Sequence, residues 1–149
     1  MTDLFNQFDI DQVTQTCQQR GKPYGISFGT MDKLSNTHLS LEAAEYARDQ
    51  GRYDEFHHNT FKAYFSDGKD IGNMEVLLEV AKESGLDADE LQAALTDKRY
   101  AERVSNGSKS AKESGVTAIP AFFIEGGDSI TGAVSEDRFR EALQSIAES

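Results

Sequence analysis

The sequence predicts an α/β protein that is mostly helical, and three observations lead to this prediction. Apolar residues recur at helical spacing over roughly eighty residues that follow Asn36. The pattern changes at Gly115, after which β-branched and aromatic residues flank a Gly-Gly pair, as in a β-hairpin. A last amphipathic segment follows Ser135. We therefore expect a helical region, then a hairpin, then a C-terminal helix.

Composition excludes several classes of protein. The 149 residues suffice for one domain with a core, and a net charge of -11 repels nucleic acid phosphates. No apolar run approaches the length of a membrane-spanning helix, and the N-terminus lacks a basic segment followed by an apolar one. We therefore expect no nucleic acid partner, no membrane insertion and a cytoplasmic location.

A single cysteine, Cys17, limits the redox and metal chemistry of the chain. It excludes an intrachain disulfide, a C-x-x-C motif and a zinc site built from thiolates. Asp54 and His58 are spaced i, i+4 on a predicted helix and are a possible metal pair, but no third ligand is suggested. We expect no metal and no cofactor, with Cys17 a packed or half-exposed residue on an amphipathic helix.

The N-terminal region predicts a broken helix followed by one short strand or extended segment. Gly21 ends the helix, and the segment YGISFGTM, with β-branched and aromatic residues between glycines, predicts a short strand or an extended segment near residues 26–28. The apolar residues at roughly helical spacing are Leu4, Phe5, Phe8, Ile10 and Val13.

The region from Asn36 to Ser114 predicts a compact bundle of four or five short helices. A first helix ends just before Gly51, and a later one begins at the N-cap Asn73 and stops at Gly85. Between them, six residues place an aromatic face on one helix: Tyr53, Phe56, Thr60, Phe61, Tyr64 and Phe65.

The bundle ends with two further helices. Asp87 and Glu90 predict a capping box, and Leu86 and Leu91 a hydrophobic staple, at the start of one helix. The last helix is expected over residues 97–114, despite the helix-weakening Gly107 in its middle.

The segment AFFIE-GG-DSITG predicts a hairpin with a two-residue type I′ turn. Phe122 and Ile124 point to one face of its first strand and Phe123 to the other, which is typical of an interior strand covered above and below. Few other strands are available to build such a sheet. After the hairpin, Ser135 is expected to cap a helix that has a Val134–Phe139 staple and a buried stripe: Phe139, Leu143 and Ile146.

The segments AYFSDGKDIGN and GVTAIPAFFI, with the order of the helices between them, resemble the DsbA-like thioredoxin superfamily, especially its FrnE-type branch of dithiol-disulfide isomerases. The resemblance implies a partial thioredoxin-like fold with a helical insert. Residues 1–35 would hold the N-terminal helix and short strand, residues 36–115 the insert, and residues 116–149 the C-terminal thioredoxin half. Ile119–Pro120 matches the family's cis-proline position.

The resemblance also implies which residues bind a substrate. Thr117, Ala118, Ile119 and Pro120 form the loop whose backbone pairs with an extended peptide or thiol ligand. The C-x-x-C half of the family is not matched, so we assign no catalytic residue. The leading hypothesis is a truncated or degenerate thiol-disulfide oxidoreductase of the FrnE type that is inactive in dithiol exchange by itself.

Two alternatives to this hypothesis stay open. An incomplete sheet leaves an unpaired edge and uncovered apolar faces, which favours a non-catalytic binding or assembly module that forms a homodimer or larger assembly. The same superfamily also contains glutathione-dependent isomerases and transferases of the kappa-like type. Whether this chain is an enzyme by itself is therefore left open by its sequence.

Overall fold

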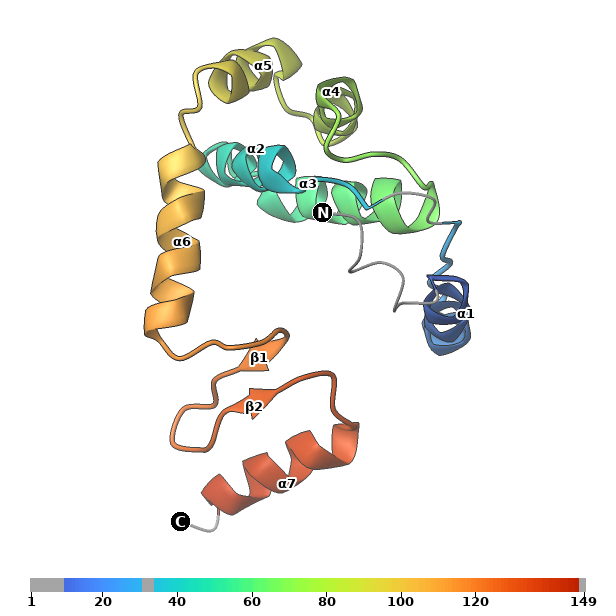
Figure 1. Ribbon diagram of the computed structural model, residues 1–149, viewed down its shortest axis with the longest axis vertical. Coiled ribbons are helices and arrows are strands. Elements are labelled where there is room, and N and C mark those ends of the chain that lie inside the picture. The colour runs from blue at the N-terminus through green and yellow to red at the C-terminus, as the bar shows by residue number, and fades with distance from the viewer. Residues whose placement is uncertain (1–9, 31–33, 148–149) are drawn as a thin grey trace. The chain divides into compact units, whose positions relative to one another are not determined.

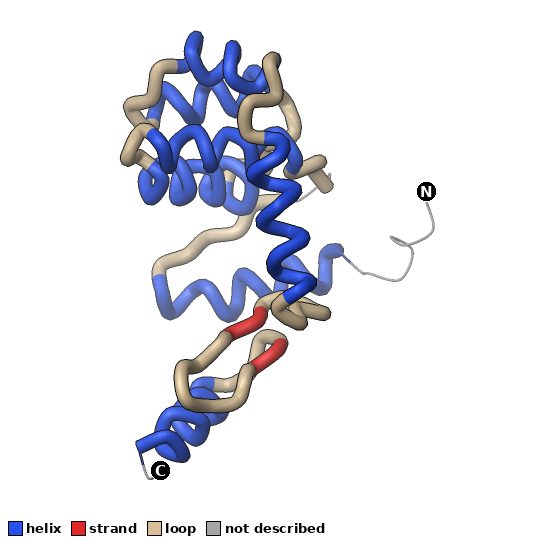
Figure 2. The backbone as a smooth tube through the Cα atoms, turned by 90° about the vertical axis from the view of Figure 1, so that its left-hand side faces the viewer, coloured by secondary structure: helices blue, strands red, loops and turns tan. Residues whose placement is uncertain are grey.

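The computed structural model describes residues 10–30 and 34–147 (Figures 1 and 2). Over these ranges the chain forms seven α-helices and two short β-strands, so the prediction of a mostly helical α/β protein is confirmed. It divides into two compact units, Met1–Val104 and Ser105–Ser149, which we call unit 1 and unit 2. The described part of unit 1 is helical, whereas unit 2 holds the strands.

The first helix, α1, spans Ile10–Gly21 and continues into a short 3-10 helix, Lys22–Tyr24. Gly21 ends α1, as predicted. Leu4, Phe5 and Phe8, which were expected to form the start of a broken helix, lie outside the described residues. Val13 is exposed, so the apolar spacing of this segment does not put it in a core.

Of the two forms predicted for residues 26–28, the short strand is wrong, because this segment is a loop with no strand partner among the described residues. Its backbone is hydrogen-bonded to helices instead. Gly29 N donates to Phe65 O at 2.8 Å, and the Ser66 hydroxyl donates to Ser27 O at 2.8 Å. The amide of Gln18 in α1 donates to Phe28 O at 3.0 Å. β-branched composition cannot reveal that helices supply these partners.

Four helices build the core of unit 1 and contact one another. They are α2 (His38–Asp49), α3 (Tyr53–Phe61), α4 (Met74–Glu83) and α5 (Ala88–Thr96). The π-helical segment η3 (Lys62–Ser66) extends α3. The largest fully buried side chains of this core are Phe56, Leu77, Val80 and Leu91.

The start and stop signals of these helices are largely confirmed. Asn73 Oδ1 accepts from Glu75 N at 2.8 Å, and Asp87 Oδ1 accepts from Asp89 N and Glu90 N, both at 3.0 Å. Gly51 and Gly85 adopt the left-handed conformation just after α2 and α4, with φ of 68° and 72°. The second hydrogen bond of the predicted capping box, from the Asp87 backbone N–H to the Glu90 side chain, is wrong. The Glu90 carboxylate instead accepts from Arg99 Nη1 at 2.6 Å. Leu86 and Leu91, the predicted staple, are both buried.

The aromatic face predicted for α3 divides into a buried part and an exposed row. Phe56 and Thr60 are buried, whereas Phe61 is 50% exposed. Rings spaced four residues apart contact in sequence: Tyr53–His57 centroids are 5.5 Å apart, His57–Phe61 4.3 Å and Phe61–Phe65 5.4 Å. A helix turns about 100° per residue, so this face is too wide for one buried stripe.

Helix α6 spans Ala101–Glu113, and so begins four residues after the predicted start at residue 97. After α5 ends, Lys98 adopts the left-handed backbone conformation, with φ of 54°, and turns the chain before α6 begins. Arg99 N then donates to Ala94 O at 3.0 Å. Helical periodicity in the sequence continues through this turn and therefore hides it.

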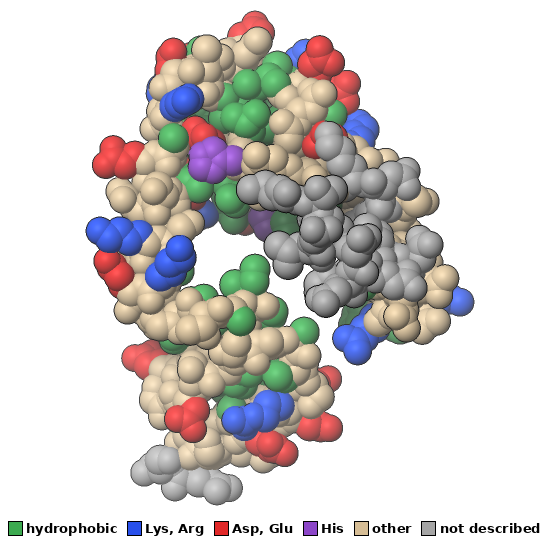
Figure 3. Space-filling model, in the orientation of Figure 1, with side chains coloured by type: hydrophobic (Ala, Val, Ile, Leu, Met, Phe, Trp, Pro, Cys, Tyr) green, Lys and Arg blue, Asp and Glu red, His purple; other side chains and the backbone are tan. Residues whose placement is uncertain are grey.

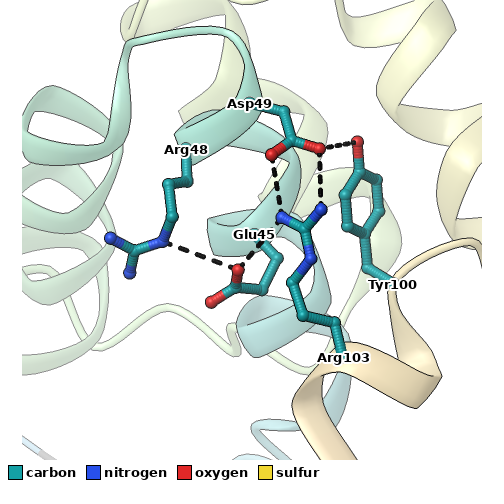
Figure 4. Close-up of polar contacts among 5 residues, drawn as sticks. All are labelled: Glu45, Arg48, Asp49, Tyr100 and Arg103. Carbon is teal, nitrogen blue, oxygen red and sulfur yellow. Dashed lines mark hydrogen bonds and ion pairs between the residues drawn. The ribbon is translucent and has the colours of Figure 1, made fainter. Parts of the chain in front are cut away.

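An ion-pair cluster joins the start of α6 to α2 (Figure 4). The Arg103 guanidinium donates to both oxygens of Asp49, at 2.8 and 3.1 Å, and lies 3.3 Å from Glu45 Oε2. The Tyr100 hydroxyl donates to Asp49 Oδ2 at 3.1 Å. The hydrogen bonds from Arg103 are the main reason that the pKa of Asp49 is lowered. Burial, and then the bond to Asp49, raises the pKa of Tyr100.

Unit 2 contains the predicted hairpin, with a different turn (Figure 2). Strands β1 (Ala121–Phe122) and β2 (Ile130–Thr131) are antiparallel, with Ala121 opposite Thr131. The two-residue type I′ turn is wrong: Gly127 N donates to Ile124 O at 3.0 Å, and of the two glycines only Gly126 has a positive φ, 78°. At Gly127 a Cβ would lie 2.7 Å from Ile146 Cδ1, so close packing on the C-terminal helix explains this glycine.

The C-terminal helix, α7, spans Glu136–Ala147 and is partly covered by the hairpin. The Phe139 ring meets Phe122 edge to face, with centroids 4.9 Å apart, and Ala142 is buried. The predicted buried stripe is wrong at Leu143, which is 58% exposed. Two strands of two residues each offer too little surface to cover a whole helix face. The interior-strand interpretation is likewise wrong within the described residues, where β1 pairs only with β2.

Candidate functional site

The four residues predicted to bind substrate lie together in unit 2, in the loop between α6 and β1. Gly115, with φ 83°, reverses the chain after α6, and Val116 N donates to Ala111 O at 3.0 Å. The Ile119–Pro120 peptide bond is cis, as the resemblance implied. Pro120 O then accepts from Gly132 N at 2.7 Å, which extends the hairpin ladder by one pair. The loop therefore leads directly into the first strand of the hairpin.

The loop is exposed, and most of its backbone groups are unpaired among the described residues. Thr117, Ala118, Ile119 and Pro120 are all exposed, and the Ile119 side chain is 86% exposed. No hydrogen bond joins the main chain of Thr117, Ala118 or Ile119 to any other described residue. The edge of β1 that faces away from β2 is unpaired within the same limits. Unpaired, exposed donors and acceptors beside a strand edge are what strand addition by an extended peptide requires.

Exposed apolar side chains follow the loop in the hairpin region, and Figure 3 shows hydrophobic side chains on the surface of unit 2. Phe123 is 63% exposed, and Phe122 and Val134 are each more than one-third exposed. The sequence predicted that Phe122 and Phe123 need cover on both faces. It did not predict that Val134 is exposed, nor that Gly132 binds Pro120, because neither feature has a periodic signal. Gly132 adopts φ 95°, a conformation that suits glycine.

Comparison with known proteins shows where this fold belongs. The family model of the DSBA-like thioredoxin domain matches residues 6–144. This chain belongs to that family. The residues matched to the DSBA-like family include the loop before β1, the hairpin and most of α7, and the fold is DsbA-like thioredoxin.

Two relatives of this DSBA-like chain are similar over most of its length. The Bacillus subtilis (strain 168) protein named Uncharacterized protein YwbO is 30% identical over 119 residues, which are 79% of this chain and 59% of that protein. The crystal structure of the probable DsbA oxidoreductase SCO1869 from Streptomyces coelicolor has a TM-score of 0.83 and 23% identity, and the match covers 99% of this chain and 65% of that one. This DSBA-like chain thus spans less than two thirds of the length of either relative.

Cys17 of this DSBA-like chain is far from the loop in the sequence, and it belongs to unit 1 whereas the loop belongs to unit 2. It lies in α1 of unit 1, seven residues after the helix begins at Ile10, and is half-buried and free. A C-x-x-C motif would place its first cysteine at a helix start, where backbone N–H groups favour a thiolate. The chain contains no second cysteine. Nothing in the position of Cys17 assigns it a redox role.

A pocket of about 450 Å³ lies beside α3 and includes the pair Asp54 and His58. Its other lining residues are Arg52, Glu55, Asn59, Glu83 and Ser84. Arg52 Nη1 donates to Glu55 Oε1 at 3.3 Å, and the Asn59 amide donates to the Ser84 hydroxyl at 3.0 Å, so these polar groups bind one another. Within residues 10–30 and 34–147, no three His, Cys, Asp or Glu side chains are grouped as metal ligands.

Residues 10–30 and 34–147 contain no helix with both the length and the apolar composition needed to cross a membrane.

Proposed function

We propose that this chain is the substrate-docking part of a FrnE-type thiol-disulfide oxidoreductase. The observation that carries the proposal is the exposed loop Thr117–Pro120, which leads into an unpaired strand edge. The backbone groups of Thr117, Ala118 and Ile119 in this loop have no hydrogen-bond partner among the described residues. Membership of the DSBA-like thioredoxin domain family supports a thiol-containing polypeptide as the ligand.

An extended peptide would bind by adding a strand beside the loop. Its backbone would hydrogen-bond to Ile119, and its apolar side chains would contact Ile119 and Phe123, which are the most exposed apolar residues of unit 2. Burying such side chains contributes roughly 25 cal/mol per Å² of apolar surface. A net charge of -11 favours basic peptides over acidic ones.

We further propose that the chain by itself does not catalyse dithiol exchange. In that reaction a thiolate attacks a substrate disulfide, forms a mixed disulfide and releases one substrate thiolate. A second protein thiolate then attacks the mixed disulfide, releases the other substrate sulfur and leaves a protein disulfide. Cys17 is the only thiol of this chain, so the second step requires a cysteine from elsewhere.

Peptide titration followed by amide hydrogen exchange tests the docking loop. The probe is a basic, valine-rich peptide without cysteine, so that any binding is non-covalent. We expect the amides of Ala118 and Ile119 to exchange more slowly with peptide, and Ile119→Asp to abolish this protection. Tyr24→Asp is the matched control, because Tyr24 is a similarly exposed apolar residue of unit 1.

Two outcomes of the titration would contradict the docking proposal. One is that saturating peptide leaves the amides of Ala118 and Ile119 unprotected. The other is protection that grows with protein concentration and needs no peptide, which would instead favour a homo-oligomer formed through the same apolar side chains.

Insulin reduction with dithiothreitol as the reductant tests the redox proposal. We expect wild type and Cys17→Ser to leave the uncatalysed rate unchanged. Acceleration by wild type that Cys17→Ser abolishes would refute the proposal of redox silence without affecting the docking loop.

A further inference from the structure

Helix α6 crosses the boundary between the two compact units. It runs from Ala101 to Glu113 without a break, whereas unit 1 ends at Val104 and unit 2 begins at Ser105. It is the orange helix of Figure 1. A helix in this position depends on its own propensity or on packing to keep its middle turns folded.

The middle of α6 has neither kind of support. Residues 105–108 are Ser-Asn-Gly-Ser, and these residue types rank below Ala, Glu and Lys in helix propensity, with Gly the lowest apart from Pro. None of the 13 residues of α6, all of which are described, is buried. The half-buried residues of α6 are Ala101, Val104 and Ala111, so its polar middle turns gain no stability from a buried apolar face.

Contacts hold the two ends of α6 but not its middle. At the start, Arg103 donates to both carboxylate oxygens of Asp49 in α2. Near the end, Ala111 O accepts from Val116 N at 3.0 Å, so this turn is tied to the loop that follows it. Between these points, no side-chain hydrogen bond joins residues 105–108 to another described residue. The weakest part of the helix therefore coincides with the boundary between the units.

We propose that residues 105–108 are a hinge, at which α6 opens reversibly by local unfolding while α2–α5 stay folded. Local opening at a free energy below that of global unfolding is expected where few apolar contacts are lost. The proposal is independent of the proposed function, because it rests only on the sequence of α6 and the contacts at its ends.

Amide hydrogen exchange of wild type and Gly107→Ala tests the hinge. A Cβ at Gly107 would meet no atom within 4 Å, and its φ is outside the left-handed region, so alanine fits without strain. The difference in helix propensity between Gly and Ala predicts about fivefold slower exchange of the amides of residues 105–111. Exchange in α4 serves as the internal control and is expected to be unchanged. Equal protection of α6 and α4 in wild type, or no slowing by Gly107→Ala, would overturn the proposal.

Limited trypsin digestion gives a second, independent measurement. Lys109 and Lys112 are exposed on α6, and cleavage there requires several residues to unfold, so the rate reports the population of the open form. We expect the first cut at one of these lysines, about fivefold slower in Gly107→Ala and faster in the matched variant Ser108→Gly. A first cut within α2–α5, or the same rate in all three proteins, would refute a hinge at this position.

Discussion

Replacing Phe56 by alanine tests how the core of unit 1 is built. The Phe56 side chain is fully buried in α3 and belongs to the same core cluster as Leu77 and Leu91. Truncating a buried phenylalanine removes its transfer free energy and leaves a cavity, which together cost about 3–5 kcal/mol. Because domains are typically stable by about 5–15 kcal/mol, the loss is a large share of the total.

Phe61→Ala is the matched control, since it changes the same residue type on the same helix. Phe61 is 50% exposed, so its truncation gives up about half of the burial of a phenylalanine, or about 1 kcal/mol. Its contact with the His57 ring, at a centroid distance of 4.3 Å, adds up to about 1 kcal/mol. We therefore expect Phe61→Ala to destabilise the protein by at most about 2 kcal/mol.

Urea unfolding of the full chain, followed by far-ultraviolet circular dichroism, measures both variants. The expected result is a clearly lower free energy of unfolding for Phe56→Ala than for Phe61→Ala. Equal losses, or a larger loss for Phe61→Ala, would refute the division of this helix face into buried and exposed parts. If Phe56→Ala does not fold, Phe56→Leu and Phe61→Leu give the same comparison with smaller changes.

Two further predictions concern a helix cap and an ion pair. Asp87→Ala removes the acceptor for two N–H groups of α5 and should lower the free energy of unfolding in urea by about 1 kcal/mol. Asp87→Asn keeps an acceptor and should lower it only a little. Equal losses in the two variants would argue against a capping role. Arg103 lowers the pKa of Asp49 below its ordinary 3.8, so the stability from Asp49 is present above that pH and is lost as the pH falls through the folded-state pKa. The difference in urea midpoint between wild type and Asp49→Asn should therefore be constant above about pH 5 and shrink toward pH 2; a difference independent of pH would contradict this reasoning.

Local signals predicted most helix boundaries of the fold. Asn73 and Asp87 begin helices, and Gly51 and Gly85 follow helix ends, because capping depends on the side chain and backbone of a few adjacent residues. Local signals did not decide between a short strand and an extended segment near residues 26–28, because strand formation needs a partner strand. The hydrogen-bond partners of this segment are helix α1 and the segment η3 that extends α3.

The sequence predicted which residues form the candidate site, but it did not predict how exposed they and their neighbours are. Thr117, Ala118, Ile119 and Pro120 are consecutive, so the sequence brings them together without help from the fold. Their exposure, and the exposed Phe123 and Val134 beside them, depend on what covers unit 2. No pattern in the sequence indicates which parts of the molecule cover these side chains.

The order of the elements, the N-terminal caps of α4 and α5, the single thiol and the loop that leads into the hairpin can all be read from the sequence. These features depend on residue type and on neighbours within a few positions. The sequence does not reveal that Phe56 is buried while Phe61 is half exposed, that Ile146 packs against Gly127, or that Arg103 reaches Asp49. Each of these depends on contacts between residues far apart in sequence, which a periodic pattern does not contain.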